Sequence, residues 1–368
     1  RMNELYSVHL STAKSWRGGE NQLWLLTRGL RARGQKVLVL APDGAPLHEK
    51  CAASGIPSQP INFHTELDPV GILRLVSALR KEAPQILHLH DGHSVLPGQI
   101  ASRAVSHDKL RLVAHRRTAF SLKGGWKFGG RVDRVIAISS AVKDVLKEGG
   151  VAAEQIRVIF SGIEFPEPLG QEHADVLALR RQLGIPDDAP LVAHAAALTS
   201  EKRQNDIIDA VCGANEKLGK IHLAIAGTGD QEGALRKQIR ERNAEKFVHL
   251  TGFMQDLRPL WGAASMAIFA SVAEGLCTAL VEAQGAGVPA VVTRAGGMTE
   301  VVEDKQTGFV VDIGDVKAMT GALVKLCMDE PLRRTLGKAA FARTRVKFSA
   351  DSMVDGVLDL YRELWRGE

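Results

Sequence analysis

The chain has 368 residues, of which 45% are hydrophobic and 24% are charged, and its net charge is +5. This is the composition of an ordinary globular protein, and the length predicts two domains. The four cysteines include no C-x-x-C pair, which argues against a zinc knuckle or a disulfide framework and suits a reducing compartment. No apolar run approaches 18 residues and no signal-peptide pattern is present, so we expect a cytoplasmic protein without a membrane span.

The charge is unevenly distributed. Residues 1–170 carry 23 Lys and Arg against 15 Asp and Glu, whereas residues 171–368 carry 24 against 27. A basic first half beside a slightly acidic second half indicates different partners for the two halves. Ordinary variation in surface composition is the alternative.

Short apolar runs alternate with helical patterns along the first half of the chain. The runs predict strands at Leu5–Leu10, Lys36–Leu40, Ile86–His90, Arg111–His115, Arg134–Ile138 and Ile156–Phe160. Helical patterns lie between several of them, at Glu20–Ala32, Ile72–Lys81 and Ser140–Glu148. This alternation predicts a parallel sheet with helices on both faces.

The second half repeats the alternation. Strands are predicted at Leu191–Ala196, Ile221–Ala226, Phe247–Leu250, Met266–Ala270, Val288–Thr293 and Phe309–Val311. Two prolines in Phe165–Gly170 predict a linker. We therefore expect an α/β protein with a Rossmann-like domain at residues 1–165, a linker at 166–170 and a second Rossmann-like domain at 171–350. Residues 351–368 should form a helix that packs on a domain surface, with a return to the first domain as one option.

Two carboxylates bracket a predicted helix in the second half. Glu274 precedes the helix Thr278–Ala286, Glu282 lies about one turn inside it, and Gly287 ends it. The free amides at a helix N-terminus favour anions such as phosphate. Because a carboxylate beside a phosphate is electrostatically unfavourable, we expect the two glutamates to bind hydroxyls. Spacing alone fits two solvated glutamates equally well.

Other polar residues follow the strands of the first half, where ligands of open parallel sheets bind. Gly18-Gly19-Glu20 opens a helix, and paired glycines let a ligand approach backbone amides. The run His88–His93 holds three histidines and one aspartate, so a metal site is conceivable. It lacks a helix-spaced partner and a thiolate, and we favour hydrogen bonds from one or two imidazoles to a substrate.

The segment His115–Arg134 interleaves basic and aromatic residues. Such a segment suits an anionic partner, either lipid headgroups or a phosphorylated acceptor. The residues expected on this acceptor or membrane side are Arg116, Arg117, Lys123, Trp126 and Lys127. Nucleic acid is disfavoured because no nucleic-acid module is recognisable. A loop with a few packed aromatics is the alternative.

Small residues and cations also follow the strands of the second half. Lys202 and Arg203 suit a ligand with two phosphates. The run Ala226–Gly229 contains two glycines of a G-x-G-x-x-G fingerprint, but the third glycine comes one place late, at Gly233. A dinucleotide-binding hypothesis is therefore poor.

Taken together, these residues resemble the retaining glycosyltransferases of family 4, which have the GT-B fold of two Rossmann-like domains facing a cleft. Glu274 to Glu282 matches the E-x7-E motif of that family. Further matching segments occur in order: Gly18-Gly19-Glu20, Ala137-Ile138-Ser139, Ser161–Glu164, Ala226–Gly229, Thr251-Gly252-Phe253, Gly296–Glu300 and Thr307-Gly308-Phe309.

The resemblance implies roles for these residues. Glu274 would contact hydroxyls of the donor sugar, Glu282 would contact the ribose, and His115 would lie near the reaction centre. The amides of Leu276, Cys277, Thr278 and Ala279, with Lys202, would hold the diphosphate, while Gly227 and Gly19 would line the donor site. Ala197 replaces a frequent family arginine, so either Arg203 supplies the second cation or the amides bear more of the charge. No metal or cofactor is expected.

The implied function is transfer of a sugar, with retention, from a nucleotide sugar to an acceptor hydroxyl in bacterial cell-surface glycan or lipopolysaccharide assembly. The acceptor would be a glycan or lipid-linked molecule, presented at the inner face of the cytoplasmic membrane. Two alternatives keep the fold. One is a nucleotide-sugar epimerase of the GT-B type, and the other is a non-catalytic subunit that binds a nucleotide sugar or a glycolipid.

Overall fold

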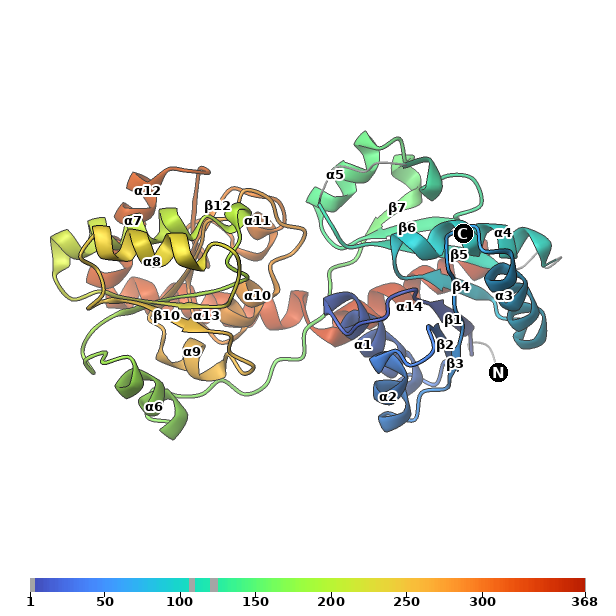
Figure 1. Ribbon diagram of the computed structural model, residues 1–368, viewed down its shortest axis with the longest axis horizontal. Coiled ribbons are helices and arrows are strands. Elements are labelled where there is room, and N and C mark those ends of the chain that lie inside the picture. Colours follow the sequence, from blue (N-terminus) through green and yellow to red (C-terminus); the bar gives the residue numbers. More distant parts are fainter. Residues whose placement is uncertain (1–3, 106–109, 120–124, 368) are drawn as a thin grey trace. The chain divides into compact units, whose positions relative to one another are not determined.

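The structure is a computed structural model that describes residues 4–105, 110–119 and 125–367. Contacts between residues divide the chain into two compact units (Figure 1). Unit 1 consists of Arg1–Gly162 and Phe348–Glu368, and unit 2 consists of Ile163–Lys347. The end of the sequence thus belongs to the same unit as its beginning.

Unit 1 contains a seven-stranded parallel sheet with the order β3-β2-β1-β4-β5-β6-β7. Its strands are β1 (Tyr6–Leu10), β2 (Lys36–Ala41), β3 (Ser58–Pro60), β4 (Ile86–Leu89), β5 (Arg111–Arg116), β6 (Arg134–Ala137) and β7 (Ile156–Val158). The described helices are α1 (Gly18–Ala32), α2 (Pro46–Ala53), α3 (Pro69–Glu82), α4 (Gly92–Ala104), α5 (Ser140–Glu148) and α14 (Ala350–Arg366), with short 3-10 turns η1 (Gly125–Phe128) and η2 (Ala153–Gln155). The direction of winding reverses between β1 and β4, and ligands bind at such a switch point.

Helices cover both faces of this sheet. On one face α1 packs against α2 and α14, and on the other α3 packs against α4 (Figure 1). The apolar residues of α14, among them Met353, Val357 and Leu364, are part of the buried core of unit 1. This helix therefore completes unit 1 although 185 residues of unit 2, Ile163–Lys347, precede it in the chain.

Unit 2 contains a six-stranded parallel sheet with the order β10-β9-β8-β11-β12-β13. Its strands are β8 (Leu191–Ala195), β9 (His222–Ala226), β10 (Val248–Gly252), β11 (Met266–Phe269), β12 (Ala290–Thr293) and β13 (Gly308–Val311). Its helices are α6 (Ala174–Gln182), α7 (Gln204–Leu218), α8 (Glu232–Glu241), α9 (Arg258–Ala263), α10 (Thr278–Gly285), α11 (Met298–Val301), α12 (Val316–Met328) and α13 (Glu330–Lys347), with a 3-10 turn η3 (Ser200–Lys202). The switch point lies between β8 and β11.

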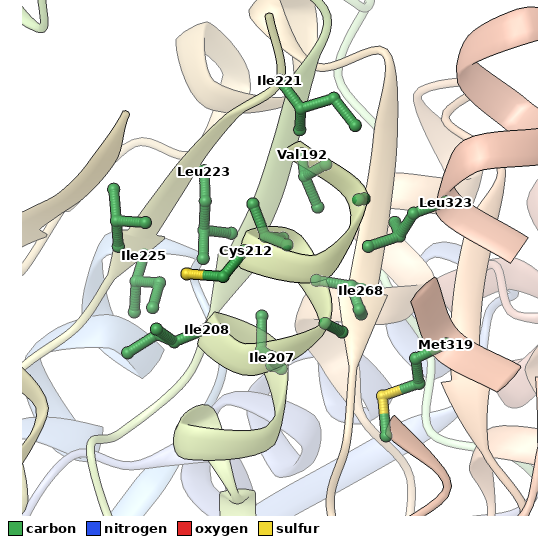
Figure 2. Packing of buried hydrophobic residues seen from close by; sticks show 14 of the residues in the cluster. Val192, Ile207, Ile208, Cys212, Ile221, Leu223, Ile225, Ile268, Met319 and Leu323 are labelled. Carbon is green, nitrogen blue, oxygen red and sulfur yellow. The ribbon is translucent and has the colours of Figure 1, made fainter. Parts of the chain in front are cut away.

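The core of unit 2 shows how the sequence pattern builds the layers. Ile207, Ile208 and Cys212 of α7 pack against the sheet strands, and Met319 and Leu323 of α12 pack beside them (Figure 2). These side chains recur at helical spacing on α7, so one stripe of the helix is buried. Burial of this stripe holds the loops that follow β8 and β9 in place.

The predicted α/β class, with two doubly wound parallel sheets, is confirmed. The predicted strands correspond to observed strands with small differences at their ends, and Gly287 has the left-handed φ of 83° expected after α10. The short strand β3, Ser58-Gln59-Pro60, is absent from the sequence prediction because three polar or proline residues give no apolar run. Across the described part of the chain, no helix combines the length and the apolar character that crossing a membrane requires.

Candidate active site

The loop after β11 and the turn η3 after β8 bring Glu274 and Lys202 together at the switch point of unit 2. The Lys202 ammonium forms an ion pair with Oε1 of Glu274, and the Ser271 hydroxyl donates to the same oxygen over 3.0 Å. Both side chains are largely buried, with exposures of 19% for Lys202 and 11% for Glu274. Burial alone would lower the pKa of Lys202, but the Glu274 carboxylate outweighs burial and raises it. Lys202 is therefore a cation at neutral pH.

The Gly-Gly loop after β12 holds the Glu274 loop by direct backbone contact. A Cβ on Gly296 would lie 2.0 Å from the carbonyl oxygen of Glu274, and a Cβ on Gly297 would lie 2.2 Å from that of Gly275. The Gly297 amide donates to the Glu274 carbonyl over 3.0 Å. Gly296 also has a φ of 48°. Glycine is needed here because any side chain would displace the loop that carries Glu274.

Helix α10 begins directly after the loop that carries Glu274, and its first backbone amides are free donors. Its N-cap residue, Cys277, makes no side-chain capping hydrogen bond, and the first amides of a helix have no acceptor within the helix. The side chains of Leu276 and Cys277 are buried, and burial raises the pKa of the Cys277 thiol to about 12. Leu276, Cys277, Thr278 and Ala279 can therefore offer backbone amides to an anion, whereas the thiol is neutral and inert.

Glu282 lies one turn into α10, in a different environment from Glu274. It lines a cavity of about 400 Å³ together with Phe253, Trp261 and the segment Glu164–Leu169. Burial raises the pKa of the Glu282 carboxyl, and the Trp261 indole opposes part of that shift. The two glutamates thus have different environments: Glu274 is in an ion pair, and Glu282 lines a mostly apolar cavity.

Gly227 and Arg203 follow β9 and β8 in the same unit. Gly227 has a φ of 143°, and a Cβ added to it would lie 1.9 Å from the Ala196 carbonyl oxygen. The Gly227 amide donates to the Gly252 carbonyl over 2.8 Å. It therefore joins the ends of neighbouring strands. The Arg203 guanidinium pairs with Asp206 over 2.6 Å, so its Nε is already engaged within α7.

In unit 1, His115 belongs to a buried cluster of four imidazoles. His9 and His88 are paired neighbours on β1 and β4, His90 follows β4, and His115 lies on β5. The rings of His88 and His90 stack at 4.1 Å, and those of His88 and His115 stack at 5.1 Å. Burial lowers the pKa of His9 to about 3 and holds the pKa values of the other three well below their usual range. All four rings are neutral at pH 7.

Hydrogen bonds show which ring nitrogens of His90 and His9 carry protons. Arg117 only donates, so its contact of 3.1 Å to His90 Nδ1 makes that nitrogen an acceptor. The His90 Nε2–H therefore donates to His9 Nδ1 over 3.0 Å, and the His9 Nε2–H donates to the Ser7 hydroxyl over 2.8 Å. In the second branch the Tyr361 hydroxyl contacts His88 Nδ1 at 2.6 Å, and His88 Nε2 contacts His115 Nδ1 at 3.0 Å. The Nε2 atom of His115 is at the end of that branch.

The same cluster contains a group with metal-binding geometry. Ligand atoms of His9, His88 and His90 lie within 4.8 Å of one another. The guanidinium of Arg117, which donates to His90, would repel a divalent cation, and ring nitrogens of all three histidines are used in hydrogen bonds. This arrangement favours a hydrogen-bonded network over a metal centre.

The residues expected on the acceptor or membrane side differ in their exposure and in their partners. Arg117 is partly exposed, and its guanidinium donates to His90 while its Nε and Nη1 atoms are buried. Lys127 pairs with Glu66 over 2.5 Å, Arg116 is half-buried, and Trp126 is exposed. Lys123 lies outside the described residues. Of the histidine run His88–His93, the last member is exposed and pairs with Glu66 over 2.9 Å.

Comparison with known proteins identifies the family. The family model described as "Glycosyltransferase Family 4" matches residues 16–165, and the model described as "Glycosyl transferases group 1" matches residues 175–343. The chain belongs to glycosyltransferase family 4. Its two parallel sheets with helices on both faces are those of the GT-B fold.

Relatives of this chain occur in bacteria. The chain is 27% identical to the "Putative glycosyltransferase EpsD" of Bacillus subtilis (strain 168), over 65% of this chain and 56% of that protein. It is 28% identical to the "Lipopolysaccharide core biosynthesis glycosyltransferase LpsE" of Rhizobium meliloti (strain 1021), over 49% of this chain and 52% of that protein. The matches thus span about half of the length of these curated relatives.

A solved structure supports the fold. Anabaena Alr3699/HepE, crystallised in complex with UDP, has a TM-score of 0.83 at 21% identity and covers 98% of this chain and 100% of its own.

The sequence analysis missed two members of the histidine cluster, His9 and Tyr361. The signal for His9 was present, because a doubly wound sheet places its first strand beside the fourth and thus His9 beside His88. No sequence signal links Tyr361 to His88, since 273 residues separate them. Their contact depends on the docking of α14.

Proposed function

We propose that this family 4 member transfers a sugar from a nucleotide-sugar donor to an acceptor hydroxyl, with retention at the anomeric carbon. The observation that carries the proposal is the Lys202–Glu274 pair, placed between the Gly-Gly loop and the uncapped start of α10. A cation, free amides and a carboxylate at one switch point suit a ligand that has both phosphates and hydroxyls. A nucleotide sugar is such a ligand.

On binding, the donor would break the Lys202–Glu274 ion pair and give each of the two side chains a new partner. Its diphosphate would bind Lys202 and the amides of Leu276 to Ala279, where the helix dipole and the cation stabilise negative charge. Neutralisation of Lys202 by phosphate leaves Glu274 free to accept hydrogen bonds from sugar hydroxyls. Glu282 would accept from the ribose hydroxyls, with the base in the neighbouring 400 Å³ cavity. The complex of Alr3699/HepE with UDP supports a uridine nucleotide as the first choice.

The chemical step would need no enzymic nucleophile. The bond from the anomeric carbon to the phosphate oxygen breaks, and the acceptor oxygen bonds to that carbon on the same face. The leaving phosphate takes the acceptor proton. Lys202 and the α10 amides would stabilise the charge that develops on the diphosphate, so the proposal includes neither a metal nor a cofactor. His115 would assist as a neutral hydrogen-bonding group, in line with its lowered pKa.

An exposed apolar patch on unit 1 supports a lipid-linked acceptor at a membrane surface. Leu67, Val70, Leu73 and Trp126 are each between 54% and 69% exposed. The ion pair of Glu66 with Lys127 ties the segment before α3 to η1, so Leu67 and Trp126 each adjoin one partner of this pair. Exposed Arg74, Arg80 and Lys81 lie on the same helix α3. Apolar and basic groups on one helix favour anionic bilayer surfaces.

A vesicle assay tests this surface. The chain should bind vesicles of phosphatidylglycerol and phosphatidylcholine at least tenfold more tightly than vesicles of phosphatidylcholine alone, and Leu73→Ser with Trp126→Ser should abolish the difference. The control is Leu177→Ser, which changes an exposed leucine of unit 2. Equal binding to both kinds of vesicle would count against contact with an anionic membrane surface. The lipopolysaccharide relative supports cell-surface glycan assembly as the setting.

Glu274→Ala tests the transferase itself. A panel of nucleotide sugars in a thermal-shift assay first names the donor, since a ligand of the native state raises its stability. Turnover of that donor with an acceptor should then fall about a hundredfold in Glu274→Ala, which corresponds to about 3 kcal/mol. Glu232→Ala, on the partly exposed face of α8 where this carboxylate pairs with Arg236, is the control. Near-normal turnover in Glu274→Ala sinks the assignment, turnover without acceptor indicates an epimerase, and tight donor binding without any turnover indicates a binding subunit.

A further inference from the structure

Three buried side chains of unit 1 form a series of hydrogen bonds that ends at His115. The Tyr361 hydroxyl contacts His88 Nδ1 at 2.6 Å, and His88 Nε2 contacts His115 Nδ1 at 3.0 Å. All three side chains are between 0% and 3% exposed. A neutral imidazole has one N–H and one bare nitrogen, so the direction of the first bond fixes the direction of the second.

The sheet and α14 place these three side chains in line. His88 on β4 pairs with Val113 on β5, and His115 lies two residues further along β5, so both imidazoles are on the same face of the sheet. The planes of the two rings are parallel to within 5°. Helix α14 packs on this face, since Val113 and Tyr361 belong to one buried core. Two neighbouring strands and a packed helix therefore set the geometry of the series.

The Tyr361 hydroxyl is the donor in the first of these bonds. Among the described residues it has no second hydrogen-bond partner, so a hydroxyl that accepted from His88 would leave its own buried proton unpaired. The separation of 2.6 Å is also usual for an O–H donor, whereas N–H donors lie about 2.7–3.2 Å from their acceptors. His88 Nδ1 is therefore bare, and the proton of this ring is on Nε2.

The proton on His88 Nε2 sets the tautomer of His115. It is donated to His115 Nδ1 over 3.0 Å, so that nitrogen is bare and the proton of His115 is on Nε2. Burial lowers the pKa of His115, which keeps the ring neutral and limits it to this one N–H. No described residue accepts from it. His115 thus offers a hydrogen-bond donor at the end of the series and cannot take up a proton there.

We propose that Tyr361 and His88 are positioning residues for sugar transfer, which together hold His115 in the tautomer whose Nε2–H donates to an oxygen of the substrate. The presence of a substrate oxygen at this N–H rests on the proposed function, whereas the tautomer follows from contacts within unit 1 alone. A nitrogen that only donates cannot remove the acceptor proton, so this proton goes to the leaving phosphate.

The ring nitrogens of His115 test the tautomer directly. A ¹⁵N spectrum of the full-length chain with labelled histidine, at neutral pH, separates protonated from bare ring nitrogens, and His115→Gln identifies the signals. His115 should show a protonated Nε2 and a bare Nδ1. In Tyr361→Phe each nitrogen of His115 should be protonated in about half of the molecules, because nothing then favours one tautomer. A protonated Nδ1 in the parent chain, or unchanged His115 signals in Tyr361→Phe, overturns the proposal.

Tyr6→Phe is the matched control for loss of a hydroxyl. Tyr6 is the other tyrosine of the chain, it is also buried in unit 1, and its hydroxyl donates to Glu82 over 2.5 Å. This variant loses a hydrogen bond of the same kind but should leave the His115 signals unchanged. If both variants move those signals alike, Tyr361→Phe acts by a general loosening of unit 1 and the proposal fails.

Substitutions at His88 cover the case in which Tyr361→Phe does not fold. His88→Gln keeps an N–H that can donate to His115 Nδ1, so it should retain the Nε2–H tautomer of His115. His88→Leu removes the donor and should release that tautomer. Identical His115 signals in these two variants contradict the role of His88.

Kinetics separate this proposal from the proposed function. With a donor named by the nucleotide-sugar panel, Tyr361→Phe should lower kcat at least about twofold at an unchanged KM for the donor, because only one tautomer donates to the substrate. Tyr6→Phe should leave kcat unchanged. Transfer by the parent chain with an equal kcat in Tyr361→Phe rejects the positioning role and keeps the transferase. Absence of transfer by the parent chain rejects the transferase and the role of this N–H in it, while the ¹⁵N spectra still decide the tautomer.

Discussion

The buried histidines predict a steep loss of stability of unit 1 in mild acid. His9, His88, His90 and His115 are neutral in the folded chain because burial depresses their pKa values. In the unfolded chain each has a pKa near 6.5. Below that pH the unfolded state binds more protons than the folded state, so acid favours unfolding. The stabilisation is fully present above about pH 6.5 and is lost as the pH falls towards the depressed values.

The size of the effect follows from proton linkage. Between pH 7.5 and pH 5.5 each histidine that stays neutral in the folded state costs about 1.4 kcal/mol, so four such residues reduce the free energy of unfolding by about 5 kcal/mol. That is a large part of the total stability of a typical domain, about 5–15 kcal/mol. The carboxylates with lowered pKa values, such as Glu66 and Asp68, titrate below this window and do not mask the effect.

Urea denaturation at pH 5.5, 6.5 and 7.5 measures this loss. Tryptophan fluorescence reports mainly on unit 1, which contains Trp16, Trp24, Trp126 and Trp365, while Trp261 lies in unit 2. His88→Gln should reduce the pH dependence by about a quarter. The exposed His93→Gln should leave it unchanged. A free energy of unfolding that stays constant across this range refutes the neutral cluster.

Four further predictions concern single contacts. Lys202→Ala and Glu274→Ala, alone and together, should show a favourable coupling of about 1–3 kcal/mol in urea denaturation of unit 2, and additive losses would contradict the ion pair. Gly296→Ala should lower sugar transfer at least tenfold, because a 1 Å shift of a catalytic loop is costly, while Gly233→Ala at an open position serves as control. Tyr361→Phe should destabilise unit 1 by about 1–2 kcal/mol, since His88 Nδ1 loses its partner; an unchanged urea midpoint argues against that contact. Glu282→Gln should raise the KM for the donor more than it lowers kcat, and steady-state kinetics with an unchanged KM would move the ribose elsewhere.

The layers of the fold could be predicted from the sequence because each sheet strand is buried on both faces and reads as an apolar run. Leu191–Ala195 and Met266–Phe269 are examples in which all residues are buried. The strand Ser58–Pro60 could not be predicted, since an edge position needs neither burial nor every backbone donor.

The candidate site was predictable only in part, for a physical reason. Its residues could be found because they follow strands, but the sequence does not tell which charges meet. Lys202 was expected to face phosphate and Glu274 to face hydroxyls, whereas the structure pairs them with each other across 72 residues of sequence. Arg117 was expected at an acceptor or membrane surface, and in the structure its partly buried guanidinium donates to His90, a contact that the sequence did not indicate. Such contacts depend on side-chain direction, which spacing does not encode.

The return of α14 to unit 1 has a consequence for synthesis of the chain. Unit 2 is complete once Lys347 has left the ribosome, but unit 1 then still lacks the helix whose Val354, Leu358 and Tyr361 fill its core. Before α14 has been synthesised, α1 exposes the apolar surface that α14 covers. This surface includes Gly29, where an added Cβ would lie 2.4 Å from a Val354 methyl. Exposed apolar surface of this kind binds chaperones or aggregates. The last segment needed for unit 2 is therefore translated before the last helix needed for unit 1.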